Sequence, residues 1–318
     1  MKMRQRLMAT LFLAMLPFSA NAAVPSVATD ITPVHSLVSQ VMAGVGKPDL
    51  LVQSGASPHN YSLSPSEAQA LQEADLVFWI GEGVTPWLKR SLGNLSPDAQ
   101  AIELLEANGT TTYTYRKGAT FGAHDDGHHD EEKADQHDQD HHHEHNGTDP
   151  HAWLDPANAK VWLEVIAAAL AEKDPEHATQ YLGNAAAGKA DIDAAVSHVK
   201  TTIAQLKDKQ FIVFHDAYQY FEKRFGIPAA GAISIGDASK PSPARIAQIR
   251  KVVTELNVSC VFTEPQYNPG IVKAVFGGTG VNTSGVIDPL GSSLPVGAGL
   301  YPDLLKGIAS NLQACLGE

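Results

Sequence analysis

Histidine is the residue type in this sequence best suited to chemistry. Nine of the fourteen histidines fall within residues 123–156, which read AHDDGHHDEEKADQHDQDHHHEHNGTDPHAWLDP. Eight of them belong to an acidic tract: His124, His128, His129, His137, His141, His142, His143 and His145. The ninth, His151, stands between two prolines, just before an expected helix start. Imidazole is a borderline-soft ligand that suits zinc. The stretch therefore holds two different candidates for metal binding, the acidic histidine tract and the single residue His151.

Three further residues lie where an expected strand meets its loop. His59 follows the strand of PDLLVQSG, His215 ends the apolar strand KQFIVFHD, and Asp288 ends SGVID. Together with His151 they could supply three imidazoles and one oxygen, which make a tetrahedral zinc shell. A manganese site would use more carboxylates. The spacing also allows the alternative that each histidine only hydrogen-bonds to its own loop.

Strands alternate with helices twice along the chain, which predicts the α/β class with parallel sheets covered on both faces. We expect an N-terminal lobe over 23–173, a connecting helix over 174–208 and a C-terminal lobe over 209–318. Within the first lobe, residues 117–148 have almost no apolar content and predict a disordered loop rich in His and Asp. Ligands of open α/β sheets bind beyond the carboxyl ends of the strands, so the site should lie in the cleft between the lobes.

Local signals fix several helix starts. Ser64 and Glu67 form a capping-box pattern, Asp155 and Pro156 suit the cap and first turn of a helix, and Ser242-Pro243 suits another.

The first 22 residues have the form of a secretory signal peptide. Basic residues precede the apolar run LMATLFLAML, and SANAA predicts cleavage after Ala22. The run is short for a membrane span, and no cysteine near the cut could carry a lipid anchor. We therefore expect a soluble protein of a Gram-negative periplasm.

The charge balance is acidic. The net charge is −12, and loss of the three basic residues of the leader makes it −15. This argues against nucleic acid or an anionic membrane as partner and suits a cation.

The chain has two cysteines, Cys260 and Cys315. In an oxidising compartment an isolated pair usually forms a disulfide, which here would join a strand to the C-terminal helix. A redox-active C-x-x-C pair is absent from the sequence.

Five ordered motifs carry a resemblance that covers essentially the whole mature chain: GASPHNYSLSPSE, DPHAWLDP, FHDAYQYFEKRFG, FTEPQYNP and VIDPLG. They resemble the signatures of the metal-binding (cluster A-I) substrate-binding proteins of ABC importers. The zinc branch of that family also has an acidic histidine tract between the first two motifs. The resemblance implies two Rossmann-like lobes, a rigid linking helix and one interlobe metal.

His59, His151 and His215 match the ligand positions of that family. Manganese-type relatives often have a carboxylate at the third position, so His215 favours zinc as the transported ligand. The resemblance further implies an ABC permease in the inner membrane as partner of a monomeric, non-enzymatic protein. On this interpretation the acidic tract gathers zinc weakly and passes it to the cleft; a solvated insertion with incidental affinity is the alternative.

The fourth ligand stays open at this point. Some zinc members use a glutamate directly before the first histidine, but Pro58 stands there in this chain. Asp288 matches the carboxylate position of the family, and water or a loop residue competes with it. Glu264 could orient a ligand imidazole, or could simply bond to backbone at a strand end.

Other functions were weighed against zinc capture and delivery. A zinc hydrolase would need a positioned base and an oxyanion stabiliser, and no such motif is visible. A manganese- or iron-binding importer component and a periplasmic zinc buffer also fit the donor set. Because protonated imidazole does not ligate, zinc affinity should fall as the pH drops through about 6.

Overall fold

The computed structural model describes residues 24–116, 118–121, 147–234 and 241–317. Its first lobe is built on a four-stranded parallel sheet in the order β2-β1-β3-β4. The strands are β1 (Val27–Thr29), β2 (Asp49–Leu50), β3 (Leu76–Trp79) and β4 (Gln100–Glu103). The helices between them are α1 (Thr32–Val41), α2 (Pro65–Gln72) and α3 (Leu88–Leu95). Only two residues of the expected strand PDLLVQSG form β2, so a long loop carries His59.

The second lobe has a three-stranded parallel sheet in the order β8-β7-β9. Its strands are β7 (Phe211–His215), β8 (Gly231–Ser234) and β9 (Cys260–Val261), and its helices are α6 (Gln219–Phe225), α7 (Pro243–Glu255) and α8 (Pro269–Phe276). The strand expected around SGVID is reduced to isolated parallel bridges, such as Thr263 with Val286. The predicted α/β class with parallel sheets is confirmed.

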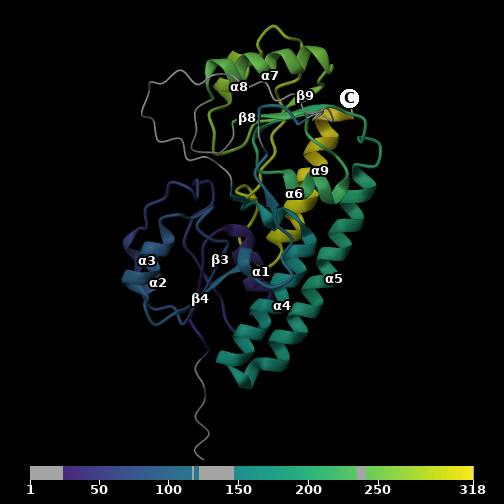
Figure 1. Cartoon of the computed structure of the whole chain (residues 1–318). Coiled ribbons are helices and arrows are strands. Elements are labelled where there is room, and N and C mark those ends of the chain that lie inside the picture. The colour runs from purple at the N-terminus through teal and green to yellow at the C-terminus, as the bar shows by residue number, and fades with distance from the viewer. Residues whose placement is uncertain (1–23, 117, 122–146, 235–240, 318) are drawn as a thin grey trace, which may run out of the picture.

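Three long helices join the two lobes. They are α4 (Pro156–Lys173), α5 (Ala178–Thr202) and the C-terminal α9 (Leu300–Leu316). Helix α5 has 25 residues, which corresponds to about 37 Å, and it packs against α4, α9 and α1 (Figure 1). It occupies most of the connector expected over 174–208, after the short 3-10 turn η3 (Pro175–His177).

The apolar residues form three layers rather than two separate cores. In β3, Leu76 and Phe78 face a central layer, while Val77 and Trp79 face a small outer layer under α2 and α3. Strand β7 alternates in the same way between the central layer and an outer layer that includes residues of α7 and α8. The central layer runs without a break from β1 through α1, α4 and α5 to α9 and β7, so the two lobes share it.

The expected helix starts are confirmed. Ser64 and Glu67 form both bonds of the capping box at α2. The Asp155 carboxylate accepts from the backbone N–H of Ala157 at the start of α4, with Pro156 as the first helical residue. Ser242 caps α7 in the same manner. These short-range patterns therefore determine where the helices that frame the lobes begin.

The segment before the histidine tract crosses to the second lobe. It contains β5 (Tyr113–Thr114), which pairs antiparallel with β6 (Thr148–Asp149). Thr120 then bridges antiparallel to Gly231 of β8, and Phe121 donates to the Ala230 carbonyl. Residues 118–121 thus lie on a sheet edge although they fall in the range expected to be a disordered loop; residues 122–146 lie outside the described part of the chain.

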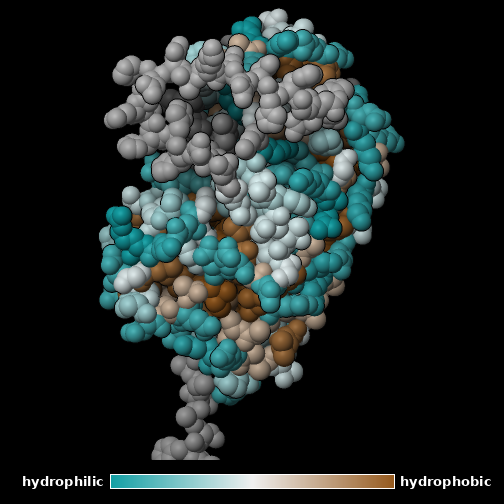
Figure 2. Space-filling model, viewed as in Figure 1, coloured by the Kyte–Doolittle hydropathy of each residue, from teal (hydrophilic) through white to brown (hydrophobic). Residues whose placement is uncertain are grey.

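The face of the molecule shown in Figure 2 is mostly polar where the residues are described. On the face shown in Figure 2, hydrophilic residues cover the outer helices, and hydrophobic residues appear mainly in the lower half of the molecule. Among the described helices, none combines the length and apolar character needed to cross a membrane.

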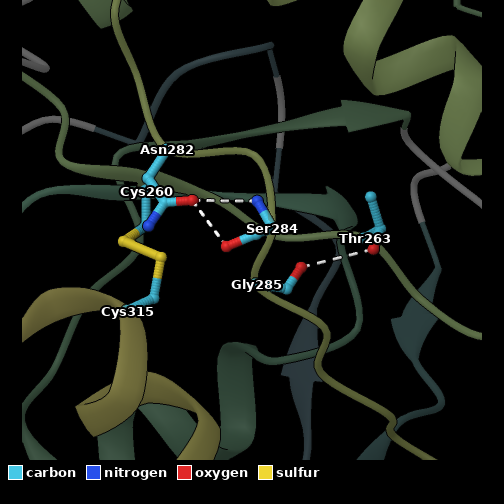
Figure 3. Close-up of a disulfide and its surroundings, with 6 residues drawn as sticks. All are labelled: Cys260, Thr263, Asn282, Ser284, Gly285 and Cys315. Carbon is cyan, nitrogen blue, oxygen red and sulfur yellow. Dashed lines mark hydrogen bonds between the residues drawn. A yellow bond between two sulfur atoms is a disulfide. The ribbon is translucent and has the colours of Figure 1, made fainter.

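The predicted disulfide is confirmed. Cys260 of β9 and Cys315 of α9 are bonded, with their Cα atoms 6.2 Å apart (Figure 3). The neighbouring chain approaches closely at Gly285, where a Cβ atom would lie 2.6 Å from the Phe262 ring and 3.3 Å from Cys315 Sγ. The bond therefore joins the sheet of the second lobe to a helix of the shared central layer.

Replacing both cysteines with serine should lower the free energy of unfolding by about 2–4 kcal/mol, because the bond closes a loop of 55 residues in the unfolded chain. Urea unfolding of the oxidised wild type, the reduced wild type and the double variant measures the effect. Equal midpoints for all three proteins would contradict it.

Asp30, the residue directly after β1, has a fully buried carboxyl group. Burial raises its pKa from 3.8 to about 7, although the backbone N–H groups of Ile80 and Ile31 donate to it at 2.8 Å and oppose the shift. Because the folded state favours the neutral form, its contribution to stability is complete below pH 3.8 and is lost as the pH rises through 7.

The side-chain carboxyl carbon of Asp30 should therefore titrate with a midpoint near pH 7 in a 13C NMR experiment. An Asp30→Asn variant assigns the resonance and should flatten the pH dependence of unfolding between pH 4 and 7. A midpoint below pH 5 would show that the backbone donors outweigh burial.

Candidate metal centre

Three histidines from distant parts of the chain meet between the lobes. The ring centres of His151 and His215 lie 5.3 Å apart, and those of His59 and His151 lie 6.1 Å apart. Zinc–nitrogen bonds of about 2.0–2.1 Å in a tetrahedral shell place imidazole ring centres about 5 Å apart. The separation of His151 and His215 is close to that value, and the separation of His59 and His151 is about 1 Å longer.

His151 comes two residues after the end of β6 and is buried. Its Nδ1 lies 2.7 Å from Asp149 Oδ1, and the same oxygen accepts from the His151 backbone N–H at 3.0 Å. A carboxylate only accepts, so Nδ1 carries the proton and the lone pair is on Nε2. His151 Nε2 is one of the few buried polar side-chain atoms in the described residues without a hydrogen-bond partner. This atom is therefore suited to ligate a metal.

His215 ends the buried strand β7, at the carboxyl edge of its sheet. Its Nδ1 lies 2.7 Å from Glu264 Oε1, which also accepts from the His215 backbone N–H at 3.3 Å. Both alternatives left open for Glu264 thus hold, because the carboxylate contacts the imidazole and the backbone. The same argument puts the proton on Nδ1 and directs Nε2 away from Glu264.

A cavity of about 10 Å³ lies between the rings. Its lining combines the three histidines with groups from both lobes: Pro58, His59, His151, Trp153, His215, Gln266, Pro289 and Leu290. The volume is about that of one water-sized probe, which suits a single ion better than an organic ligand. Within the described residues no set of three or more His, Cys, Asp or Glu side chains has ready-made metal-binding geometry.

Aromatic residues hold the walls of this cavity. Trp87 Nε1 donates to the Pro58 carbonyl at 2.8 Å, which fixes the loop that carries His59. Trp153 is buried, and its indole N–H donates to the Pro289 carbonyl at 2.7 Å. Its ring centre also lies 5.2 Å from that of His151. Trp153 therefore serves the core and the cavity together.

Asp288 is half-buried beside the cavity and organises the loop that follows it. Its carboxylate accepts from the backbone N–H groups of Leu290, Gly291 and Ser292 and from the Ser292 hydroxyl, at 2.6–3.0 Å. Burial of Tyr218 raises the pKa of its hydroxyl, and the negative charges of Glu264 and then of Asp288 raise that pKa further. Asp288 is not among the groups that line the cavity.

The remaining histidines fall elsewhere. His35 is buried on α1 and bonds to the Pro48 carbonyl and the Ser39 hydroxyl, which agrees with a packing role. His198 is exposed on α5, and His177 ends η3, where its Nδ1 lies 2.7 Å from Asp174 Oδ2. The eight histidines from His124 to His145 lie outside the described residues.

Sequence reasoning missed Asp149, the partner of His151. The signal was present, because an aspartate two residues before a histidine can accept from both its N–H and its Nδ1. It also missed Gln266 in the cavity wall and Arg116, which binds the carboxylate next to His215.

Two parallel α/β lobes, a long shared helix and imidazoles converging between the lobes define a metal-binding substrate-binding protein. The chain belongs to the ZnuA family, since the family model described as zinc-uptake complex component A, periplasmic, matches residues 27–315. The ZnuA zinc uptake protein of Brucella suis is 44% identical over 307 residues, 92% of each chain. That of Paracoccus denitrificans is 41% identical over 318 residues, covering 98% of this chain and 97% of the relative.

Solved structures agree on the fold. The laminin-binding adhesin Lmb of Streptococcus agalactiae superposes with a TM-score of 0.72 at 26% identity, covering 92% of this chain and 99% of that one. A zinc-bound ZnuA deletion mutant superposes with a TM-score of 0.71 at 24% identity, covering 91% of this chain and 97% of its own.

Proposed function

We propose that this protein is the high-affinity zinc-binding component of an ABC importer, which captures Zn²⁺ in the periplasm and delivers it to the membrane permease. The observation that carries the proposal is the buried His151 Nε2, which lies without a hydrogen-bond partner in the described residues and beside the rings of His59 and His215. Three imidazoles around a cavity of ionic size match the donor preference of zinc.

His59, His151 and His215 are the proposed ligands. Asp288 is the proposed fourth, and it would have to bind the ion with a lone pair that its four loop bonds leave available. Water in the fourth position is the competing arrangement. The Asp288→Asn variant distinguishes these two arrangements and keeps one acceptor oxygen for the loop. Because only a carboxylate ligand adds negative charge to the shell, zinc affinity should fall in this variant if Asp288 is the fourth ligand and stay unchanged if water is.

The acidic histidine tract is proposed as a weaker, auxiliary zinc-binding segment. Its ligands would be the histidines from His124 to His145, and ordering such a segment costs about 1–2 kcal/mol per residue fixed. It should therefore bind zinc less tightly than the cleft and raise the local concentration of the ion.

The remaining features follow from the same proposal. Residues 1–22 act as a cleaved signal peptide, and the mature protein is a monomer that performs no chemical reaction. Its partner is the inner-membrane permease, and its acidic charge makes nucleic acid an unsuitable partner.

Competition among metals tests the proposal. The mature protein should bind one zinc ion tightly and retain it against a large excess of Mn²⁺ or Fe²⁺, and a deletion strain should grow poorly only in zinc-poor medium. Displacement by Mn²⁺ would indicate a manganese importer component. Normal growth of the deletion strain with intact zinc binding would indicate a periplasmic buffer.

A further inference from the structure

Two glutamines occupy equivalent places behind the two buried histidines. Each histidine donates from Nδ1 to one oxygen of a carboxylate, and in each case a glutamine amide donates to the other oxygen. The two sets of residues come from different parts of the chain. The same order of histidine, carboxylate and glutamine therefore belongs to the site and not to a repeated sequence motif.

Behind His151 the glutamine comes from the other lobe. Gln219 of α6 is buried, and its Nε2 donates to Asp149 Oδ2 at 2.9 Å and to the Thr114 carbonyl at 3.1 Å. Both partners can only accept, so the amide orientation is determined by chemistry. The Tyr220 hydroxyl holds the Asp149 carbonyl at 2.6 Å. Helix α6, which begins four residues after His215, thus fixes the carboxylate that orients His151.

Behind His215 the arrangement stays within one lobe. Gln266 Nε2 donates to Glu264 Oε2 at 2.8 Å, while Glu264 Oε1 accepts from His215. Gln266 also lines the cavity between the rings, and its side chain is only half-buried. One amide donor on each carboxylate fixes the plane of that carboxylate, and the plane determines where the imidazole Nε2 points.

We propose that Gln219 and Gln266 are positioning residues for zinc, which act through Asp149 and Glu264 to fix the tautomer and direction of His151 and His215. The inference rests on the proposed zinc-binding function. Partners of metal-bound histidines change affinity by about 10-fold to 100-fold when they are removed, and the glutamines lie one bond further out. We therefore expect a loss of about tenfold for each glutamine.

Gln219→Leu and Gln266→Leu remove the amide donors while keeping side chains of similar size. Gln40→Leu is the matched control, because Gln40 Nε2 donates to Asp191 Oδ2 at 2.8 Å between α1 and α5. Zinc affinity is measured by competition with a chromophoric chelator, and Co²⁺ absorption reports the geometry of the shell. Gln219→Leu and Gln266→Leu should each bind zinc about tenfold more weakly and show altered Co²⁺ spectra. Gln40→Leu should match wild type in zinc affinity and in Co²⁺ spectrum.

Two further measurements separate positioning from general damage. Gln219→Leu combined with Asp149→Asn should bind zinc no more weakly than Asp149→Asn alone, since Gln219 acts through that carboxylate. In metal-free wild type at pH 8, 15N NMR should show the proton of both rings on Nδ1. If Gln219→Leu does not fold, the inference is still tested by Gln266→Leu, because the Gln266 side chain is only half-buried, and by the ring tautomers of wild type.

Three results would overturn the inference. They are wild-type zinc affinity in Gln219→Leu and Gln266→Leu, additive losses of affinity in the double variant, or a proton on Nε2 of the His151 and His215 rings in wild type. A wild-type protein that binds no zinc in the same titration would instead refute the proposed function.

Discussion

Replacing His151 with alanine is expected to lower zinc affinity by at least about 100-fold. The substitution removes the buried Nε2, and it leaves Asp149 Oδ1 without the imidazole N–H that lies 2.7 Å away. Partners of a ligand histidine already contribute up to about 100-fold, so the ligand itself should contribute more. Competition with a chelator of known affinity measures the loss, with Co²⁺ spectra reporting any change in coordination number.

His198→Ala is the matched control, because His198 is exposed on α5 and lies outside the cleft. Its zinc affinity and stoichiometry should equal those of wild type. Equal affinities for the two alanine variants would show that the ion binds elsewhere, and would remove the basis for assigning the cleft as the transport site.

Replacing Arg116 with alanine should lower the free energy of unfolding by about 3–5 kcal/mol. Arg116 lies before the histidine tract, and its guanidinium binds Asp216 and Glu222 of the second lobe. Both carboxylates are about 4% exposed. Without Arg116 two buried acids would face each other unpaired. Burial already raises the pKa of Glu222, and Arg116 opposes that rise.

The destabilisation should therefore be larger at pH 8 than at pH 5. With Arg116 absent, the pKa of Glu222 rises further, so the folded state retains a proton that the unfolded chain loses as the pH increases. Lys160→Ala is the comparison, since Lys160 pairs with Asp193 on the surface and should contribute less than about 1 kcal/mol. Urea unfolding at pH 5 and pH 8 measures both effects. Equal small losses in the free energy of unfolding for the two variants would show that the contacts of Arg116 with Asp216 and Glu222 add little stability.

Local patterns predicted the parts of the fold that depend on neighbouring residues. The capping box of Ser64 and Glu67 and the Asp155-Pro156 helix start were confirmed, because each motif satisfies backbone groups within one turn of itself. The pairing of Cys260 and Cys315 also followed, since the chain offers no alternative partner. The positions of the ligand candidates at strand ends followed from the general rule for parallel sheets.

Contacts between distant segments were not predictable in this way. Gln219 and Asp149 are 70 residues apart, and nothing in either motif specifies that an amide from one lobe meets a carboxylate of the other. The strands expected near Gly55 and Val286 are also shorter than predicted, since the first forms a two-residue strand and the second only isolated bridges. The sequence likewise predicted two lobes without indicating that they share an apolar layer.

That shared layer limits how such proteins can recombine. Because Val213, Leu163, Ile192 and Leu305 belong to one continuous cluster, side chains of both lobes must fit each other's shapes. A chimera that takes one whole lobe from a relative would join mismatched surfaces along the middle of the molecule. Exchange confined to the outer layers, such as α2 with α3 or α7 with α8, would leave the packing of the central layer intact and would require a fit only to one face of one sheet, so these peripheral helices are the natural units for exchange.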